Sequence, residues 1–147
     1  LMRDSLSGLE PQIREKNLEV SLSLLGDNDG RLDVIADEAA IMRVLTNLFI
    51  NAIRFTPKGG QIAVESRRGP QNETVVVSVQ DSGPGILPED QGRIFDQFYK
   101  ADKSRQSEGS GLGLYIARNL LAAHGQRIEA GKSSLGGAKF TFSLTLA

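Results

Sequence analysis

The sequence has no cysteine and only one histidine among its 147 residues. Without thiols the chain forms neither disulfides nor thiolate metal sites, and one histidine rules out a multi-histidine metal site. The formal net charge of −1 gives no excess of basic residues for nucleic acid or an anionic membrane. No apolar run approaches the roughly 20 residues that cross a bilayer. We therefore expect a domain that binds no nucleic acid and is not itself embedded in a membrane.

The length fits one domain with a single core. Apolar residues at helical spacing predict a helix over residues 1–16, although Pro11 interrupts the pattern. Alternating apolar and polar residues predict a strand over residues 17–24, and a second short strand follows over residues 31–36. Turn-forming residues 26–30 separate these strands, so we expect the two to pair as a hairpin.

Asp37 is expected to cap a helix over residues 38–55, one face of which is apolar at three- and four-residue steps. Asn47, Asn51 and Arg54 form a narrow polar stripe on this helix, at positions i, i+4 and i+7. Asparagines buried without partners are costly, so the stripe is either solvated, or part of an internal hydrogen-bond network, or facing a polar ligand. Neutral amide oxygens suit a hard cation that keeps most of its waters, such as Mg²⁺.

A run of β-branched residues over 74–79 predicts a buried strand, which a loop joins to a preceding strand over 61–66. The segment Asp81-Ser-Gly-Pro-Gly85 follows directly, and its glycines permit positive φ and close approach to a ligand. The same segment also fits an ordinary tight turn, so it leaves the role of Asp81 open. Residues 87–90 predict the start of a short helix, and the aromatics within 93–99 favour a core anchor over a stacking platform.

Residues 100–109 are polar and basic without periodicity, which predicts a mobile loop. The segment Gly109-Ser-Gly-Leu-Gly113 leads from this loop into a predicted helix over residues 114–124. Backbone N–H groups at such a helix start form an anion site, for which phosphate is the usual ligand. His124 lies in the last turn of the helix, where we expect a structural role. Two strands complete the chain, over residues 126–130 and 138–146.

Taken in order, these motifs resemble the catalytic, ATP-binding domain of bacterial sensor histidine kinases, in the family shared with gyrase, Hsp90 and the mismatch-repair ATPases. The resemblance covers about residue 30 to the end of the chain. It rests on four segments: Asn47-Leu-Phe-Ile-Asn-Ala-Ile-Arg-Phe-Thr-Pro57, Asp81-Ser-Gly-Pro-Gly-Ile86, Phe95-Asp-Gln-Phe-Tyr99 and Gly109-Ser-Gly-Leu-Gly-Leu114. It implies an α+β Bergerat fold, a two-layer α/β sandwich in which a mixed, mostly antiparallel sheet packs on three main helices.

The resemblance also implies ATP and Mg²⁺ as ligands and assigns roles to particular residues. Asp81 would accept a hydrogen bond from the adenine amine, and Asn51 with Asn47 would hold Mg²⁺, while Asn47, Asn51 and Arg54 form the catalytic set. The family often has threonine where this chain has Ala138, so a hydroxyl contact beside Asp81 is missing or supplied by water. The nucleotide-binding residues that it implies are Asn51, Asp81, Gly83, Gly85, Ile86, Phe95, Phe98, Tyr99, Lys100, Lys103, Gly109, Ser110, Gly111, Leu112, Gly113 and Leu114.

The resemblance favours transfer of the γ-phosphoryl group to a histidine over ATP hydrolysis. Asn47 occupies the position where the gyrase and Hsp90 branch has a glutamate base, and an amide cannot take a proton at neutral pH. The acceptor histidine would lie on a dimerisation domain outside this chain, with residues 1–16 as a helix entering from it and residues 17–147 as the catalytic domain. Two alternatives stay open: an anti-sigma-type serine protein kinase, and a nucleotide-binding module without transfer activity.

The same resemblance implies partners and a location for the parent protein. We expect a homodimeric parent that passes the phosphoryl group to a response regulator, with this domain in the cytoplasm. The resemblance is compatible with a parent that is held in the inner membrane.

Overall fold

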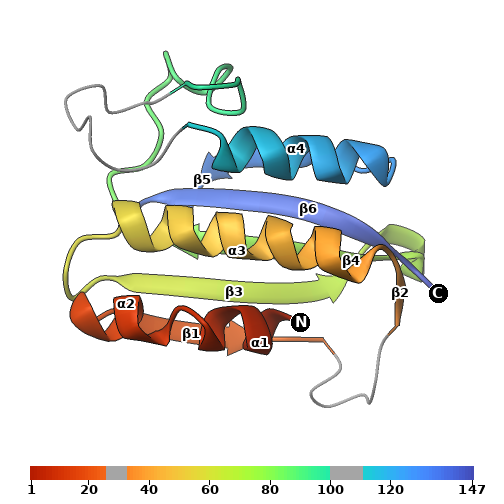
Figure 1. The fold of residues 1–147 in the computed structure, drawn as a ribbon, viewed down its shortest axis with the longest axis horizontal. Coiled ribbons are helices and arrows are strands. Elements are labelled where there is room, and N and C mark those ends of the chain that lie inside the picture. Colours follow the sequence, from red (N-terminus) through yellow and green to blue (C-terminus); the bar gives the residue numbers. More distant parts are fainter. Residues whose placement is uncertain (26–32, 100–110) are drawn as a thin grey trace.

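The computed structural model describes residues 1–25, 33–99 and 111–147 of the chain. Within these ranges the chain forms one six-stranded sheet with its helices on one face, so the fold has two layers (Figure 1). The strands are β1 (Glu19–Ser23), β2 (Val34–Ile35), β3 (Gln61–Arg68), β4 (Thr74–Asp81), β5 (Ile128–Lys132) and β6 (Ala138–Leu146). The helices are α1 (Met2–Ser7), α2 (Glu10–Glu15), α3 (Glu38–Phe55) and α4 (Gly113–Ala123), with a short 3-10 helix at Pro70–Asn72.

The strands follow the order β1-β3-β4-β6-β2 across the sheet, and β5 also pairs with β6. β1 runs parallel to β3, whereas the other pairs of the described sheet are antiparallel. α3 and α4 are the long helices, and α1 with α2 forms a third helical segment on the same face (Figure 1). The two-layer α+β sandwich with a mixed, mostly antiparallel sheet is therefore confirmed.

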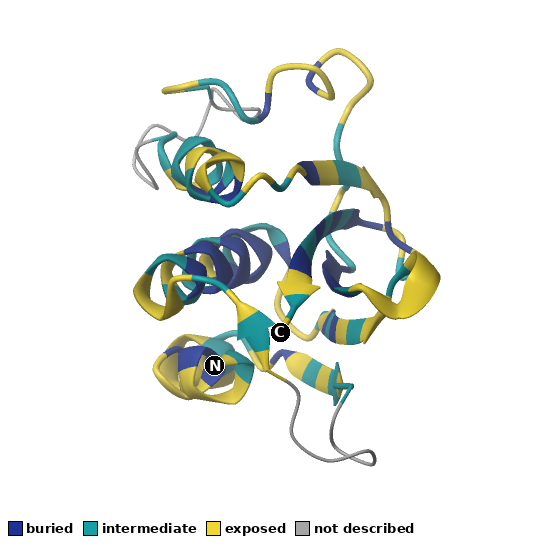
Figure 2. Cartoon of the chain, turned by 90° about the vertical axis from the view of Figure 1, so that its right-hand side faces the viewer, coloured by how far each residue is buried: buried dark blue, intermediate teal, exposed yellow. Residues whose placement is uncertain are grey.

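The core lies between the helices and the sheet, and Figure 2 shows buried residues on the sides of the two layers that face each other. The core side chains are apolar residues from both layers. β6 contributes alternate residues, as its period of two predicts, whereas the β-branched run of β4 is buried on both faces. None of the described helices is long and apolar enough to cross a membrane. The apolar side of α3 consists of Ile41, Val44, Leu45, Leu48, Phe49, Ala52 and Ile53.

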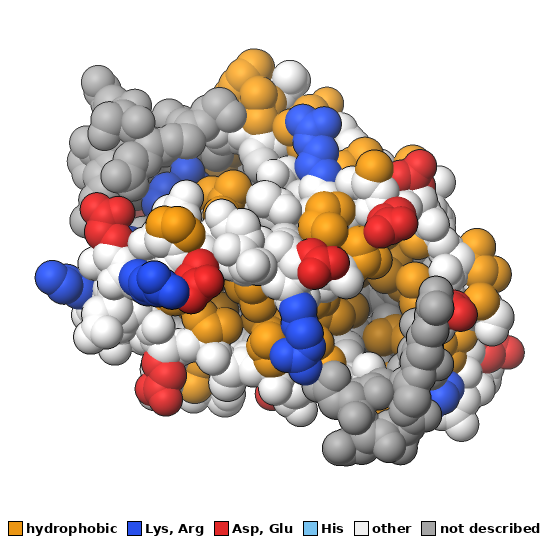
Figure 3. Space-filling view, turned by 60° about the horizontal axis from the view of Figure 1, so that its bottom comes forward, with side chains coloured by type: hydrophobic (Ala, Val, Ile, Leu, Met, Phe, Trp, Pro, Cys, Tyr) orange, Lys and Arg blue, Asp and Glu red, His pale blue; other side chains and the backbone are white. Residues whose placement is uncertain are grey.

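Charged side chains of both signs are spread over the surface. Figure 3 shows lysine and arginine side chains close to aspartate and glutamate side chains on one face of the molecule. On α2, Arg14 pairs with Glu10 at 2.6 Å, and both side chains are exposed. Such exposed pairs contribute about 0.5 kcal/mol or less each. Burial of the core, rather than surface charge, therefore holds the two layers together.

α3 begins at the predicted cap. The Oδ1 of Asp37 accepts a hydrogen bond from the N–H of Ala40 at 2.8 Å, which satisfies one of the free N–H groups of the first turn. The helix ends at Phe55, where Thr56 takes up an extended conformation before Pro57. Both predicted ends of this helix are confirmed.

α3 and α4 lie side by side in antiparallel orientation and are joined by a hydrogen bond near each end of α4 (Figure 1). At one end, the Nδ2 of Asn47 donates to the carbonyl O of Gly113 at 3.1 Å. At the other end, the N–H of Asp37 donates to the Nε2 of His124 at 3.0 Å, while the Nδ1 of His124 lies 2.8 Å from the carbonyl O of Leu120. His124 is therefore a structural residue with its proton on Nδ1, as its place at the helix end predicted.

The expected hairpin between the first two strands is wrong. β1 pairs with β3, while β2 pairs with β6 on the other side of the sheet. Alternation identifies a half-buried strand but not its neighbour, which long-range packing decides. The turn residues 26–30 of the expected hairpin lie outside the described residues.

Two helix predictions also need correction. The N-terminal helix is broken into α1 and α2 near Gly8, and Pro11 stands in the first turn of α2, where a missing N–H costs nothing. Residues 87–90 form turns instead of a helix, although the N–H of Asp90 donates to the carbonyl O of Leu87 at 2.9 Å. Further turns follow, but their i→i+4 bonds, from Gln91 to Leu87 and from Ile94 to Asp90, are not consecutive, so no helix propagates.

We expect Asp37→Ala to lower the free energy of unfolding by about 1 kcal/mol, because the cap of α3 is lost. Asp37→Asn is the matched control, since asparagine caps helices as well as aspartate does. Urea denaturation measures both variants. An equal loss of stability in both would mean that the charge of Asp37, and not its capping bond, stabilises the fold.

Candidate functional site

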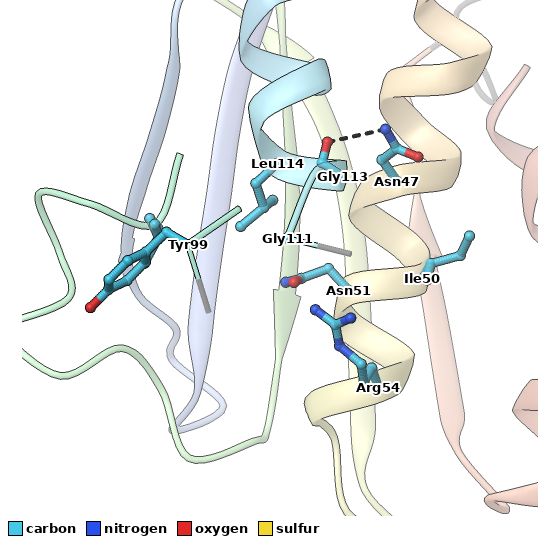
Figure 4. A pocket seen from close by; sticks show the side chains of 9 residues that line it. Asn47, Ile50, Asn51, Arg54, Tyr99, Gly111, Gly113 and Leu114 are labelled. Carbon is cyan, nitrogen blue, oxygen red and sulfur yellow. Dashed lines mark hydrogen bonds between the residues drawn. The ribbon is translucent and has the colours of Figure 1, made fainter. Parts of the chain in front are cut away.

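A pocket of about 190 Å³ lies between α3, the start of α4 and the segment that ends at Tyr99 (Figure 4). Asn47, Asn51 and Arg54, the polar stripe predicted on α3, form one wall of it. The glycine-rich start of α4 forms the facing wall. The remaining wall residues are Ile50, Ile94, Tyr99, Gly111, Gly113 and Leu114.

Asn51 is the stripe residue most suited to meet a ligand. Its side chain is only 8% exposed, and Figure 4 shows its amide pointing from α3 toward Gly111. Within the described parts of the chain, no hydrogen bond joins this amide to another residue. The amide is reached from the pocket, so a polar ligand there would complete its hydrogen bonds.

The other two stripe residues are held by contacts with the protein. The bond from Asn47 to Gly113 fixes its amide against the start of α4 (Figure 4). The guanidinium carbon of Arg54 lies 4.8 Å from the ring centroid of Phe55, which is a cation–π contact. The stripe therefore brings two amides and one positive charge to the same wall.

The amide oxygens of the stripe fit one kind of metal site. The described residues contain no group of three or more histidine, cysteine, aspartate or glutamate side chains that could hold a metal ion. Two neutral amide oxygens give little charge to a divalent cation, but they suit hydrated Mg²⁺ when an anionic ligand supplies the charge. The pocket therefore fits a cation that arrives with its ligand.

The start of α4 is anchored by a close backbone contact. The carbonyl O of Gly111 accepts from the N–H of Phe98 at 3.0 Å. Gly111 has φ of +73°, and a Cβ there would lie 2.7 Å from the carbonyl carbon of Phe98, so glycine is required. α4 then begins at Gly113 without a side-chain cap, which leaves first-turn N–H groups for a ligand.

The three aromatic residues of the segment that ends at Tyr99 have different environments. Phe95 packs edge-on against Phe140 with ring centroids 6.1 Å apart, so the predicted core role is right for Phe95. The same prediction is wrong for Phe98, which is 64% exposed and has φ of +63°. Tyr99 donates its hydroxyl proton to the buried carboxylate of Asp90, and its hydroxyl points away from the asparagine stripe (Figure 4).

Asp81 is the last residue of β4 and is only 2% exposed. Its Oδ1 accepts from the N–H of Gly83 at 2.9 Å and from the N–H of Ala138 at 3.1 Å. Burial raises the pKa of the Asp81 carboxyl above its ordinary value of 3.8, while these two hydrogen bonds lower it in part. A Cβ at Gly137 would overlap Oδ1, so the approach of β6 to this carboxylate requires glycine.

Asp81, Gly83, Gly85 and Ile86 do not line the pocket beside the asparagine stripe. The end of α3 connects the two regions, because a Cβ at Gly83 would lie 2.7 Å from the carbonyl O of Phe55. The predicted site residues Lys100, Lys103, Gly109 and Ser110 lie outside the described residues.

Comparison with known proteins decides the family. Residues 36–147 match the model of the histidine kinase-, DNA gyrase B- and HSP90-like ATPase family. The chain belongs to this family. It is a catalytic, ATP-binding domain of the type found in sensor histidine kinases, as its relatives indicate.

Individual relatives show how much of a longer protein this domain matches. The sensor-like histidine kinase SenX3 of Mycobacterium tuberculosis is 38% identical over 120 residues, which are 80% of this chain and 29% of SenX3. The solved catalytic domain of histidine kinase ThkA has a TM-score of 0.83 and 33% identity, and the match covers 98% of this chain and 89% of ThkA. Full-length ShkA in complex with AMPPNP has a TM-score of 0.82 and 30% identity, covering 99% of this chain and 30% of ShkA. The chain thus spans less than a third of SenX3 and of ShkA.

Ala138 stands where the resemblance led us to expect a threonine. The structure keeps a contact at this position all the same, since the backbone N–H of Ala138 donates to Asp81. The methyl side chain is buried, so it fills space beside the carboxylate without adding a polar group. Position 138 therefore orients Asp81 through its backbone.

Sequence patterns did not reveal every residue that shapes the site of this ATPase domain. Ile50 and Ile94 line the pocket, although Ile50 is 45% exposed and reads in sequence as part of an apolar helix. Gly137 stands against Asp81, 56 positions along the chain by their numbers, so no local pattern links them.

We expect Asp81→Asn to be at least as stable as the wild type near neutral pH. The folded wild type keeps the Asp81 proton to higher pH than the unfolded chain does. The free energy of unfolding of the wild type therefore falls as the pH rises from 3.8 through the raised pKa of Asp81. Above the raised pKa, this free energy stays at the lower value. Asparagine accepts the same two N–H groups without the cost of a buried charge. Urea denaturation between about pH 4 and pH 7 should show the free energy of unfolding of the wild type falling relative to that of Asp81→Asn as the pH rises. A large loss of stability in Asp81→Asn at neutral pH would contradict this account of the carboxylate.

Proposed function

We propose that this domain binds Mg·ATP and transfers the γ-phosphoryl group to a histidine on a dimerisation domain of the same parent chain. The observation that carries the proposal is the pocket in which the asparagine stripe faces the glycine-rich start of α4. Amide oxygens for a hydrated cation and helix N–H groups for phosphate together make a nucleotide-phosphate site. The solved complex of ShkA with AMPPNP supports this assignment.

In this proposal Asp81 recognises the adenine base. Oδ1 is already engaged by Gly83 and Ala138, so the carboxylate is fixed in one orientation. No hydrogen bond to Oδ2 is found among the described residues, and this oxygen can accept from the exocyclic amine of adenine. Gly83, Gly85 and Ile86 would form the sides of the adenine site.

The phosphate chain would lie in the pocket beside α3. Backbone groups of Gly111, Leu112, Gly113 and Leu114 would meet the phosphates, together with Lys100, Lys103, Gly109 and Ser110 from beyond the described residues. The oxygens of Asn51 and Asn47 would hold Mg²⁺ and its waters, and Arg54 adds a positive charge. When bound, Mg²⁺ offsets the phosphate charge. In this proposal residues 100–110 cover the nucleotide, and the aromatic residues that precede them, Phe95, Phe98 and Tyr99, anchor this segment.

Transfer would depend on positioning and charge, because the described pocket wall offers no carboxylate or histidine as a base. His124 is unsuited as the phosphoryl acceptor. Both of its ring nitrogens take part in hydrogen bonds, and it lies 11 residues along α4 from Gly113, or about 16 Å. A histidine from another domain must therefore enter the pocket.

The parent protein would place this domain beside its acceptor. We propose that residues 1–16 join it to a dimerisation domain, that the parent is a homodimer, and that a response regulator receives the phosphoryl group. The names of relatives such as SenX3, a sensor-like histidine kinase, support this arrangement. Because ATP is a cytoplasmic metabolite, we place the domain on the cytoplasmic side.

With labelled Mg·ATP, we expect the chain alone to bind nucleotide without labelling itself. Addition of the parent's histidine-bearing dimerisation domain should give acid-labile label on that domain. Label on the isolated chain would contradict the proposal. Acid-stable label on serine of a partner protein would favour the serine kinase alternative, and binding without any transfer would favour a nucleotide-binding module.

We expect Asn51→Ala to weaken the dependence of ATP affinity on Mg²⁺, because one amide oxygen for the hydrated cation is lost. Calorimetry with and without Mg²⁺ should show that the gain in ATP affinity produced by Mg²⁺ is about tenfold smaller in the variant than in the wild type. Asn119→Ala, at an exposed position of α4, is the control and should leave the gain unchanged. An unchanged gain in Asn51→Ala would show that the stripe does not meet the cation.

A further inference from the structure

The side chain of Lys16 closes the carboxyl end of α3. Its Nζ donates to the carbonyl oxygens of Ile53, Arg54 and Thr56 at 2.7, 2.9 and 3.0 Å. The last carbonyls of a helix have no partner within the helix, and a cation at this end is favoured by the helix dipole. An ammonium group has three donors, so all three of them are used here.

Backbone hydrogen bonds strengthen the same junction. The N–H of Gly59 donates to the carbonyl O of Lys16 at 2.8 Å, and the N–H of Glu19 donates to the carbonyl O of Gly60 at 2.9 Å. Lys16 is also the C-cap residue of α2. The junction therefore ties the N-terminal helices to the end of α3 and to the loop after it.

The end of α3 stands between this junction and the candidate site. Asn51 and Arg54 line the pocket within the last five residues of the helix. On the other side, Gly83 packs against the carbonyl O of Phe55, and its N–H holds Asp81. A shift of the helix end would therefore change the position of the stripe relative to Asp81.

We propose that Lys16 is a positioning residue for nucleotide binding. By fixing the end of α3, it sets the distance between the phosphate side of the site, at Asn51 and Arg54, and the base side, at Asp81. Lys16 itself does not line the pocket. The inference rests on the proposed binding of Mg·ATP, and it links nucleotide affinity to the position of α1 and α2.

The test compares Lys16→Met with two matched controls. Lys58→Met removes an exposed cation from the loop after α3. Ser5→Ala removes the hydrogen bond between the hydroxyls of Ser5 and Thr46 at 2.8 Å, which joins α1 to α3 away from the pocket. Calorimetry with Mg·ATP is done well below the unfolding temperature of each variant, so that loss of stability alone leaves the affinity unchanged.

We expect Lys16→Met to bind Mg·ATP about fivefold to tenfold more weakly, with both controls near the wild type. Hydrogen exchange at the Thr56 amide, which donates to the carbonyl O of Ala52, should become faster in Lys16→Met only. If Lys16→Met does not fold, Lys16→Gln, which keeps a neutral donor, takes its place in the comparison. Wild-type affinity in the Lys16 variant would overturn the inference alone, whereas a wild type that binds no Mg·ATP would overturn the proposed function as well.

Discussion

The antiparallel pairing of α3 with α4 is the contact on which the site depends. Two hydrogen bonds fix it, one from Asn47 to Gly113 and one from Asp37 to His124. The bonded residues are 10 apart along α3 and its cap and 11 apart along α4 and its cap, so the two spans are about 15 and 16 Å and nearly match. A slip by one turn, about 5.4 Å, would break both bonds and separate the asparagine stripe from the glycine-rich helix start. The bonds that order the helices therefore also build the pocket.

The base side of the site depends on a different constraint, the burial of Asp81. Burial raises the pKa of its carboxyl, and the hydrogen bonds from Gly83 and Ala138 only partly compensate. β6 can approach this carboxylate because Gly137 has no side chain. A buried charge with one oxygen held in place costs stability but gives a rigid acceptor. The end of α3, fixed by Lys16, joins this side to the phosphate side.

Local signals in the sequence predicted the parts of the fold that local physics decides. α3 has the predicted bounds because a capping aspartate and apolar periodicity act within a few residues of each other. The partner of β1 could not be predicted, since β3 lies beyond an intervening helix and alternation does not name a neighbour. Lys16 was missed because its acceptors lie 37 to 40 residues away. No local pattern indicates the positive φ and the exposed side chain of Phe98.

The claim that Asp81 recognises adenine is tested most directly by base selectivity. Adenine offers an amine where guanine has a carbonyl oxygen, and a carboxylate accepts only from the amine. Calorimetry with Mg·ATP and Mg·GTP should show a strong preference of the wild type for ATP, by about a hundredfold or more. Asp81→Asn should bind ATP much more weakly and lose most of this preference. An unchanged ratio of the two affinities in Asp81→Asn would contradict the account.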